Sequence, residues 1–443
     1  MRALKNFFIF LLSEGTSYVF NFLTTVYLAR VLKVTDFGKI NFAYAFFAFG
    51  SIFANFGLLS IGTRDIAQLS VSESKKNQAQ YIINFLSLRF LIATVVFGIL
   101  WIIATLIVHE IRVKTLIVLY SLTLFPTALS LEWVFLGWEK AGYIMISKII
   151  TAVSYFLLAL AFIKGPTEIN QIPLFFFLSN LLGTIFLLIS YLGNSTLTDI
   201  KFELDVWLKR WWHLIKNALP FGLGTLFIQF SLNFNVIFLG LIKTSTEVGF
   251  YSASFKILSF LLIFDRVVNN TTFPIISRYT QFSKDKLLSL INKINKLIFV
   301  IALPISVITF ILHQDLIVFV YGKNYLKSAQ LIQVLIWFLL ITMLNSIFTT
   351  TVIAQNRQQI YISVVSKGFV ANLISNAIFV PLLGALGTAI ALVLQELVIF
   401  IFFHVKTKLI VSPKIYWQNL SKPLTATLVT AIFTLILKNK LGF

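Results

Sequence analysis

YIINFLSLRFLIATVVFGILWIIATLIV, residues 81–108, decides the fold class, because it carries one charged residue, Arg89, in an otherwise apolar run. A helix that crosses a bilayer needs about 20 mostly apolar residues. Twelve runs of this kind occur along the chain, so we predict an all-α, polytopic membrane protein with twelve core transmembrane helices. The runs cover residues 7–29, 40–62, 81–108, 115–136, 143–163, 173–193, 214–240, 248–276, 294–312, 328–353, 361–382 and 385–405.

The composition of the whole chain supports this prediction. Of the 443 residues, 58% are hydrophobic and 12% are charged, whereas a soluble globular protein carries about 25% charged residues. The 47 Phe residues exclude a disordered chain. Without Cys, the chain has no disulfides, thiolate metal sites or catalytic cysteine.

An internal duplication divides the predicted helices into two lobes. Ser17 and Asn21 correspond to Gln229 and Asn233, and the segment 33–38 resembles 244–249. Six helices per repeat give both halves the same orientation, as in transporters with parallel repeats and a binding site between them. We predict lobes at 1–200 and 201–410, related by a pseudo-two-fold axis, and an extension at 411–443 with a possible thirteenth helix near 423–437.

The distribution of basic residues predicts the orientation. The net charge is +20, from 36 Lys and Arg against 16 Asp and Glu. The loops predicted on one side hold 18 Lys and Arg and those on the other side hold 11. Because basic loops stay on the cytoplasmic side, this bias predicts that the N-terminus lies in the cytoplasm. We therefore expect a multi-pass protein of the cytoplasmic membrane. The first run is interrupted by Glu14 and has no cleavage site, so we expect a retained helix.

Polar residues inside the predicted spans indicate a hydrophilic cavity. At 100° per residue, Lys256, Arg266 and Asn270 share one face of a helix, while Asp265 points to the opposite side. Polar residues in hydrocarbon usually face the bundle interior or a cavity, although Ser, Thr and Asn also join helices to one another. Similar polar stripes occur at Ser17, Asn21, Thr24 and Thr25, at Thr225, Gln229 and Asn233, and at Thr342, Asn345, Ser346 and Thr349.

A cavity lined by cations favours an anionic ligand. Arg offers a forked donor for phosphate or carboxylate, and Lys offers a compact charge. Arg89 is a further candidate, which either snorkels or pairs with Glu132 or Glu14. The candidate substrate-binding residues are therefore Arg266, Lys256, Arg89, Asn270, Gln229, Asn233 and Asn21.

The chain lacks the motifs of an enzyme or an ATPase. No G-x-x-x-x-G-K-[ST] loop occurs, so uphill transport would use an ion gradient, with Glu14 and Asp265 as candidate coupling groups for a proton or sodium. The four His stand singly, without the spacing of metal ligands. We therefore expect no metal, no cofactor and no enzymatic activity.

The sequence resembles the polysaccharide-transport flippases of the multidrug/oligosaccharidyl-lipid/polysaccharide exporter superfamily. The resemblance covers essentially the whole chain. The residues that carry it are YLARVL at 27–32, DFG at 36–38, FGL at 56–58, TRDIA at 63–67, LEW at 131–133, VGFYSA at 248–253 and Pro274.

This resemblance implies two six-helix lobes around a central cavity and alternating access. The substrate would be a polyprenyl-pyrophosphate-linked oligosaccharide for surface polysaccharide such as O-antigen, with membrane lipid around its tail. Basic cavity residues would hold the anionic head group, which matches Arg266, Lys256 and Arg89. A polysaccharide polymerase and glycosyltransferases would be partners, and nucleic acid would not.

Two other functions remain open at the level of sequence. A multidrug exporter of the same superfamily would bind cationic drugs in an acidic cavity. The basic stripe argues against this function, although four acids are also predicted to be buried: Glu14, Glu132, Asp265 and Glu396. An integral-membrane polysaccharide polymerase or glycosyltransferase would need a large outer loop, and no loop here exceeds about twenty residues.

Overall fold

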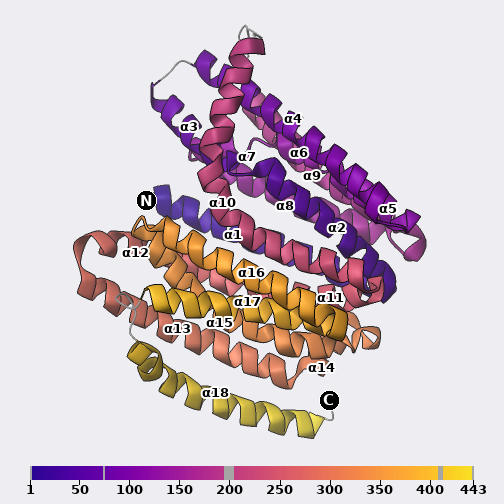
Figure 1. Cartoon of the computed structure of the whole chain (residues 1–443), viewed down its shortest axis with the longest axis vertical. Helices are drawn as coiled ribbons and strands as arrows, with labels where there is room; N and C mark the ends of the chain where they lie inside the picture. The colour runs from indigo at the N-terminus through magenta and orange to yellow at the C-terminus, as the bar shows by residue number, and fades with distance from the viewer. Residues whose placement is uncertain (1, 73–74, 194–203, 408–412, 442–443) are drawn as a thin grey trace. The chain divides into compact units, whose positions relative to one another are not determined.

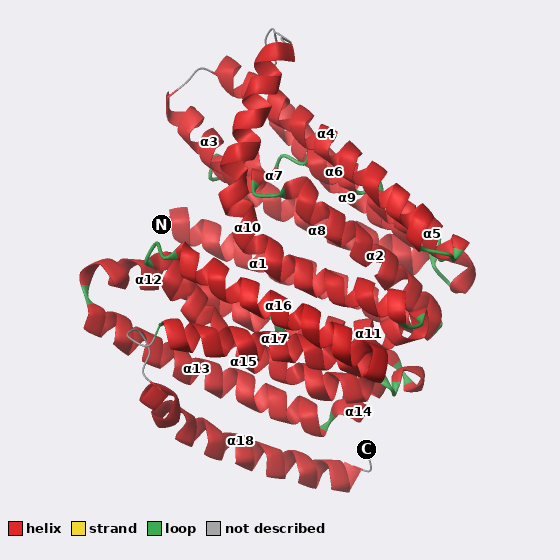
Figure 2. Cartoon of the chain, viewed as in Figure 1, coloured by secondary structure: helices red, strands yellow, loops and turns green. Residues whose placement is uncertain are grey.

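The computed structural model describes every residue except 1, 73–74, 194–203, 408–412 and 442–443. The described residues form helices joined by short loops (Figure 2), as predicted. The chain folds into two compact units, the N unit (Met1–Ile237) and the C unit (Phe238–Phe443). The lobe boundaries predicted at 200 and 410 stay predictions.

The N unit is a bundle in which helices distant in sequence pack together (Figure 1). α1 packs against α8, α8 against α9, α2 against α5, α3 against α7, and α4 against α6. The helices are α1 (Arg2–Val31), α2 (Val34–Asn55), α3 (Leu58–Ser72), α4 (Lys75–Ile107), α5 (Ile111–Ser121), α6 (Leu124–Leu129), α7 (Glu132–Gly137), α8 (Ala141–Phe162), η1 (Pro166–Glu168) and α9 (Gln171–Leu192).

The C unit is a second bundle, centred on α15. α15 packs against α11, α12, α13 and α17, and α16 packs on α17. α10 (Leu204–Ile242) runs from the N unit to the start of the C unit. The helices that follow are α11 (Ser245–Leu261), α12 (Ile263–Phe282), α13 (Lys284–Ile311), α14 (His313–Tyr321), η2 (Lys323–Tyr325), α15 (Ser328–Ala354), α16 (Gln358–Leu383), α17 (Ala385–Lys406) and α18 (Pro413–Leu441).

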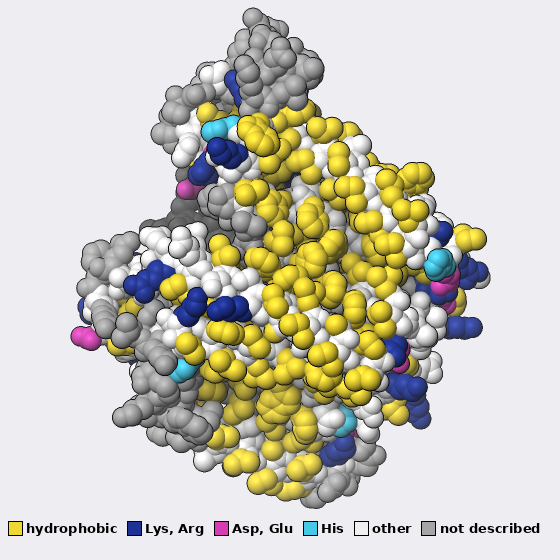
Figure 3. All heavy atoms as spheres, in the orientation of Figure 1, with side chains coloured by type: hydrophobic (Ala, Val, Ile, Leu, Met, Phe, Trp, Pro, Cys, Tyr) yellow, Lys and Arg dark blue, Asp and Glu magenta, His cyan; other side chains and the backbone are white. Residues whose placement is uncertain are grey.

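The helices have the length and surface of membrane spans. In the described residues, ten segments are long and apolar enough to cross a bilayer. Large apolar side chains remain exposed along them, including Leu106 and Leu382, each 74% exposed. Within each unit, the face in Figure 3 is largely apolar, with Lys and Arg gathered toward its edges. The chain is therefore a multi-pass membrane protein, while the number of twelve spans stays a prediction.

The predicted thirteenth helix is α18, which lies alongside α13 (Figure 1). The Nζ of Lys438 lies 3.0 Å from Asp315 Oδ2, which ties the end of α18 to the start of α14. The apolar part of α18, Pro423–Ile436, is shorter than a usual span. That it crosses the membrane stays a prediction.

Three runs predicted as continuous helices are interrupted, and one of them, at 248–276, is divided at Leu262 between α11 and α12. The run at 40–62 breaks at Phe56 and Gly57, because Gly57 has a φ of +67°, a conformation that ends a helix. The run at 115–136 breaks at Ser130, whose backbone is extended. The interruptions leave helix ends within membrane segments, where water is absent and each end needs a partner.

The helix boundaries support the predicted duplication. α1 ends at Val31 and α10 at Ile242, and the next helices begin at Val34 and Ser245, so both boundaries are 211 residues apart. The amides of the corresponding asparagines also bond alike. Asn21 Nδ2 donates to Ser17 O at 2.8 Å, and Asn233 Nδ2 donates to Gln229 O at 2.9 Å.

Candidate functional site

Arg89 lies inside the N unit on α4, with 2% of its surface exposed. Its Nη1 donates to Ser130 O at 3.0 Å, and its Nη2 donates to Thr127 O at 2.7 Å and to Asn55 Oδ1 at 2.9 Å. The guanidinium therefore joins α4 to the ends of α2 and α6. It does not snorkel.

The breaks in α2 and α6 explain why a cation is present at this position. The last carbonyls of a helix have no partner within the helix, and they carry the negative end of the helix dipole. Thr127 and Ser130 supply such carbonyls at the end of α6. A planar guanidinium can donate to several acceptors at once, so Arg89 bonds two carbonyls at the end of α6 and also the side chain of Asn55, the last residue of α2.

A polar pocket of about 200 Å³ lies beside Arg89 within the N unit, and we call it the Arg89 pocket. Several donors in its lining are already committed: Thr184 Oγ1 donates to Pro126 O at 3.0 Å and Thr151 Oγ1 to Ser147 O at 3.0 Å. Apart from Leu59 the lining is polar, and it includes Thr127, Glu132, Thr151, Asn180 and Thr184.

Glu132 is the acidic member of the Arg89 pocket. Its carboxylate interacts electrostatically with Arg89, and among the described residues the two side chains form no ion pair. The pairing of Arg89 with Glu132 that the sequence allowed is thus a through-space attraction. The binding of substrate by Arg89 stays a prediction.

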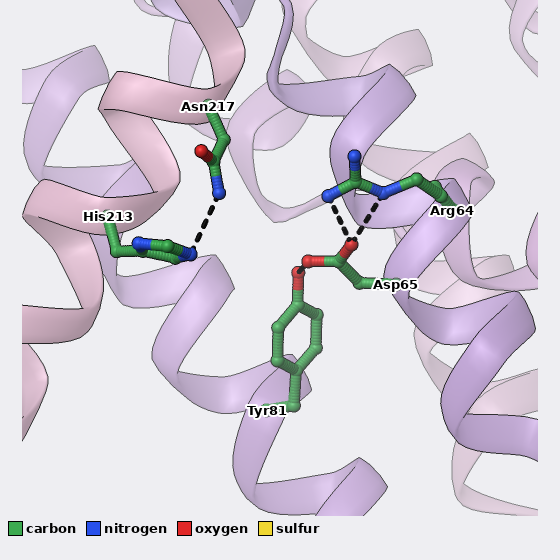
Figure 4. A network of polar contacts seen from close by, with 5 residues as sticks. All are labelled: Arg64, Asp65, Tyr81, His213 and Asn217. Carbon is green, nitrogen blue, oxygen red and sulfur yellow. Dashed lines mark hydrogen bonds and ion pairs between the residues drawn. The ribbon is translucent and has the colours of Figure 1, made fainter. Parts of the chain in front are cut away.

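The TRDIA motif contributes a second polar cluster to the N unit, shown in Figure 4. Arg64 donates to Asp65 Oδ1 from Nε at 3.0 Å and from Nη2 at 2.9 Å. Tyr81 donates from its hydroxyl to Asp65 Oδ2 at 2.8 Å. On α10, Asn217 Nδ2 lies 2.9 Å from His213 Nε2. Asp65 therefore ties α3 to α4.

The predicted cation face in the C unit spans two helices rather than one, because α11 ends at Leu261 and α12 begins at Ile263. Leu262 between them keeps a helical backbone, so the direction of the segment continues. Arg266 is exposed and Lys256 is half-buried. At about 1.5 Å rise per residue, the two lie roughly 15 Å apart along the segment.

Asp265 on α12 is half-buried, whereas its neighbour Arg266 is exposed, and α12 packs against α15. That the two side chains lie on opposite sides of the helix stays a prediction. Glu396 on α17 accepts a bond from Asn345 Nδ2 at 2.7 Å. Glu396 was predicted only as a buried acid and not as a site residue. The polar stripe that includes Asn345 was the available signal, since a polar residue inside a span needs a partner.

The remaining candidates divide between the units. Asn21 and Gln229 are exposed and Asn233 is half-buried, all in the N unit, whereas Asn270 is exposed in the C unit. The side chain of Glu14 lies outside the described residues. Among the described residues, no three His, Asp or Glu side chains gather as a metal site.

Comparisons with known proteins agree with this architecture. The sequence pattern of the family described as polysaccharide biosynthesis protein matches residues 3–280. A putative O-antigen transporter of Shigella dysenteriae is 26% identical over 410 residues, which cover 90% of this chain and 98% of that protein. A putative O-antigen transporter of Escherichia coli K12 is 23% identical over 63% of this chain and 66% of its own length.

Solved structures share the fold at low sequence identity. The lipid II flippase MurJ in an inward closed conformation has a TM-score of 0.77 at 13% identity, covering 98% of each chain. An inward-facing multidrug resistance transporter of the MATE family has a TM-score of 0.71 at 14% identity, covering 89% of this chain and 94% of its own. These relatives and neighbours are transporters and flippases, not enzymes. Since the family pattern spans more than half of the sequence, the chain belongs to the polysaccharide biosynthesis protein family.

Proposed function

We propose that this chain is a flippase that moves a polyprenyl-pyrophosphate-linked oligosaccharide across the cytoplasmic membrane by alternating access, for the synthesis of surface polysaccharide. The observation that carries the proposal is the pair of cations, Lys256 and Arg266, within the membrane segment Ser245–Thr280. A charge in hydrocarbon is costly, so such residues usually face water and mark a substrate path.

The spacing of the two cations suits a moving anion. Because they lie roughly 15 Å apart along the membrane segment, a pyrophosphate can leave one cation as it approaches the other. Arg266 offers a fork of donors and Lys256 a compact charge. The names of the O-antigen transporters that are similar to this chain support the same class of substrate.

The neutral polar candidates would contact the glycan. Asn21, Gln229 and Asn270 are exposed, and their amides can donate to and accept from sugar hydroxyls. We further propose an N-terminus on the cytoplasmic side, and glycosyltransferases and a polymerase as partners that supply the substrate and consume the product.

Alanine substitution of the two cations tests the proposal. We expect Arg266→Ala and Lys256→Ala each to abolish surface polysaccharide in a strain that depends on this chain, because the head group loses its charged contact inside the membrane. The measurement is surface polysaccharide per cell, normalised to the amount of the protein in the membrane.

Lys164→Ala is the matched control, since Lys164 is an exposed cation between two spans and its loss should leave polysaccharide unchanged. Normal polysaccharide in both the Arg266 and the Lys256 variants would contradict the proposal. Resistance to cationic dyes conferred by the wild-type chain would support a drug exporter instead.

A further inference from the structure

Two exposed lysines of the C unit lie where the membrane helices α16 and α17 pack side by side. Lys367 on α16 places its Nζ 4.2 Å from the centre of the Phe402 ring on α17. Lys406 on α17 donates from Nζ to Ser363 Oγ on α16 at 2.9 Å. Each lysine therefore reaches across to the other helix, and we call Lys367 and Lys406 the seam lysines.

The two contacts belong to one register of α16 against α17. Ser363 and Lys367 are one helical turn apart, and so are Phe402 and Lys406. A step of four residues along α16 is thus matched by a step of four residues back along α17, as expected for antiparallel neighbours. The two contacts are therefore about 6 Å apart along the helix axes.

Close packing of the helices fixes this register. A Cβ on Gly368, the residue after Lys367, would stand 2.4 Å from Ile399 Cγ1 and 3.4 Å from Gln395 O on α17. Only a residue without a side chain allows this approach of the two backbones. The positions of the seam lysines are therefore set by the packing of two helices and not by a flexible loop.

The seam lysines lie on a surface that faces lipid. Both are exposed, and Lys367 shares one face of α16 with exposed apolar residues at helical spacing. The exposed apolar residues around it are Val370, Ile374 and Ile378 on α16 and Ile401 and Val405 on α17. In the C unit, Figure 3 shows Lys and Arg side chains beside the apolar face over α16, whose place is labelled in Figure 1. An acyl chain can therefore lie along the apolar surface next to the two cations.

Lys367 begins well inside the membrane segment. The span Gln358–Leu383 is about 39 Å long, and Lys367 lies roughly 14 Å from its start, at 1.5 Å per residue. Because the hydrocarbon core is about 30 Å thick, a centred span places the Cα of Lys367 below the head groups. A charge at this depth is costly unless it meets water or a partner.

The two helices themselves supply no negative charge to the seam lysines. The sequence of α16 has no Asp or Glu, and the single acid of α17, Glu396, accepts a bond from Asn345 on α15. In the part of the chain that the structure describes, neither Lys367 nor Lys406 forms an ion pair. An ammonium group has three N–H donors, of which Lys406 uses one on Ser363. Donors and positive charge are thus available to a ligand from outside the chain.

We propose that the seam lysines bind the phosphate of an anionic phospholipid, whose acyl chains lie along the exposed apolar surface of α16 and α17. The negative head group complements the two cations, and a lysine that begins in the hydrocarbon extends toward the head groups. The predicted orientation places the site in the cytoplasmic leaflet, which carries anionic lipids. The site does not depend on the flippase function proposed above.

Native mass spectrometry of the purified protein in detergent micelles tests the site, with phosphatidylglycerol as the probe. The measurement is the Kd of the most tightly bound lipid in the wild type, in Lys367→Gln, in Lys406→Gln and in the double variant. We expect the Kd to rise about fivefold in each single variant and about 25-fold in the double variant, because each cation attracts the phosphate.

Lys323→Gln is the matched control. Lys323 is an exposed cation of the C unit that lies outside the spans, so its loss should leave the Kd unchanged. The double variant Lys367→Arg/Lys406→Arg keeps both charges and should bind phosphatidylglycerol nearly as the wild type does. A second measurement is the rise in Tm on addition of phosphatidylglycerol, which should be smaller in the double Gln variant.

Three results would overturn the site. The same Kd in the wild type and in the double Gln variant would mean that phosphatidylglycerol binds elsewhere. Equal Kd values of the wild type for phosphatidylglycerol and for zwitterionic phosphatidylethanolamine would mean that acyl chains alone are bound. Displacement of phosphatidylglycerol from the wild type by an equimolar amount of undecaprenyl phosphate would mean that the site takes a carrier lipid instead.

Discussion

Arg89 shows what a single residue can do where two helices end inside a membrane. Its fork of donors reaches Asn55, Thr127 and Ser130, which belong to two interrupted helices. The sequence marked Arg89 as an unusual charge in an apolar span, but it could not indicate the partners, because these lie between 34 and 41 residues away. The buried charge stabilises the N unit only while these acceptors surround it.

Arg89→Lys should lower the thermal stability of the protein. The ammonium keeps the charge but cannot donate to three acceptors in one plane, and each lost hydrogen bond to a charged group costs about 1.5–3 kcal/mol. We expect a lower Tm of the purified protein in detergent and less protein in the membrane.

Arg64→Lys is the control for that measurement. Arg64 also bonds a carboxylate, but its side chain is 48% exposed, and exposed ion pairs contribute about 1 kcal/mol or less. A Tm for Arg89→Lys equal to that of Arg64→Lys would show that the buried hydrogen bonds do not stabilise the fold.

At the scale of the element, the joint between α16 and α17 depends on a side chain from the start of α11. Gly384 has φ +59° and ψ −131°, a region open almost only to glycine. Glu247 Oε2 accepts the Ala385 N–H at 2.8 Å, and a Cβ on Gly384 would stand 2.8 Å from the same oxygen. A carboxylate at a helix N-terminus is favourable, since it meets unpaired N–H groups and the positive end of the dipole.

Gly384→Ala should therefore destabilise the C unit by about 1–3 kcal/mol, from strained backbone and displacement of the Glu247 carboxylate. The measurement is the Tm of the purified protein. Gly193→Ala is the matched control, since Gly193 has a helical φ of −69° and a Cβ there would meet only Ile189 O, at an ordinary contact distance of 3.6 Å. Equal Tm values for the two alanine variants would refute this account of the joint.

At the scale of the whole molecule, charge distribution predicts orientation in the membrane. The chain has no Cys, so a single introduced thiol can be labelled without background. Lys164 and Arg357 are both exposed and are predicted to lie on the outer and inner sides, respectively.

We expect Lys164→Cys to react with a membrane-impermeant maleimide in intact spheroplasts, and Arg357→Cys to react only after the membrane is opened. Both variants should react equally after solubilisation, which controls for thiol accessibility. The reverse pattern would invert the predicted topology, and with it the side on which the substrate enters.

Several features of this protein follow from the sequence by itself. The twelve apolar runs, the all-helical fold and the duplication can be read from the sequence alone. The free energy of transferring a helix into a bilayer is a sum over its own residues, so it does not depend on which helices become neighbours. The predicted separation of Asp265 from Arg266 is equally local, since helical periodicity turns neighbouring residues by 100°. Helix interruptions were not predicted, because an apolar run looks alike whether Ser130 is helical or extended.

Only the tertiary structure decided which polar groups meet. Arg89 bonds residues at the ends of two broken helices, Glu247 caps a helix 138 residues further on, and Glu396 on α17 accepts a bond from Asn345 on α15. A buried polar group must find a partner wherever the packing places one. That partner depends on which helices become neighbours, and hydropathy carries no information about it.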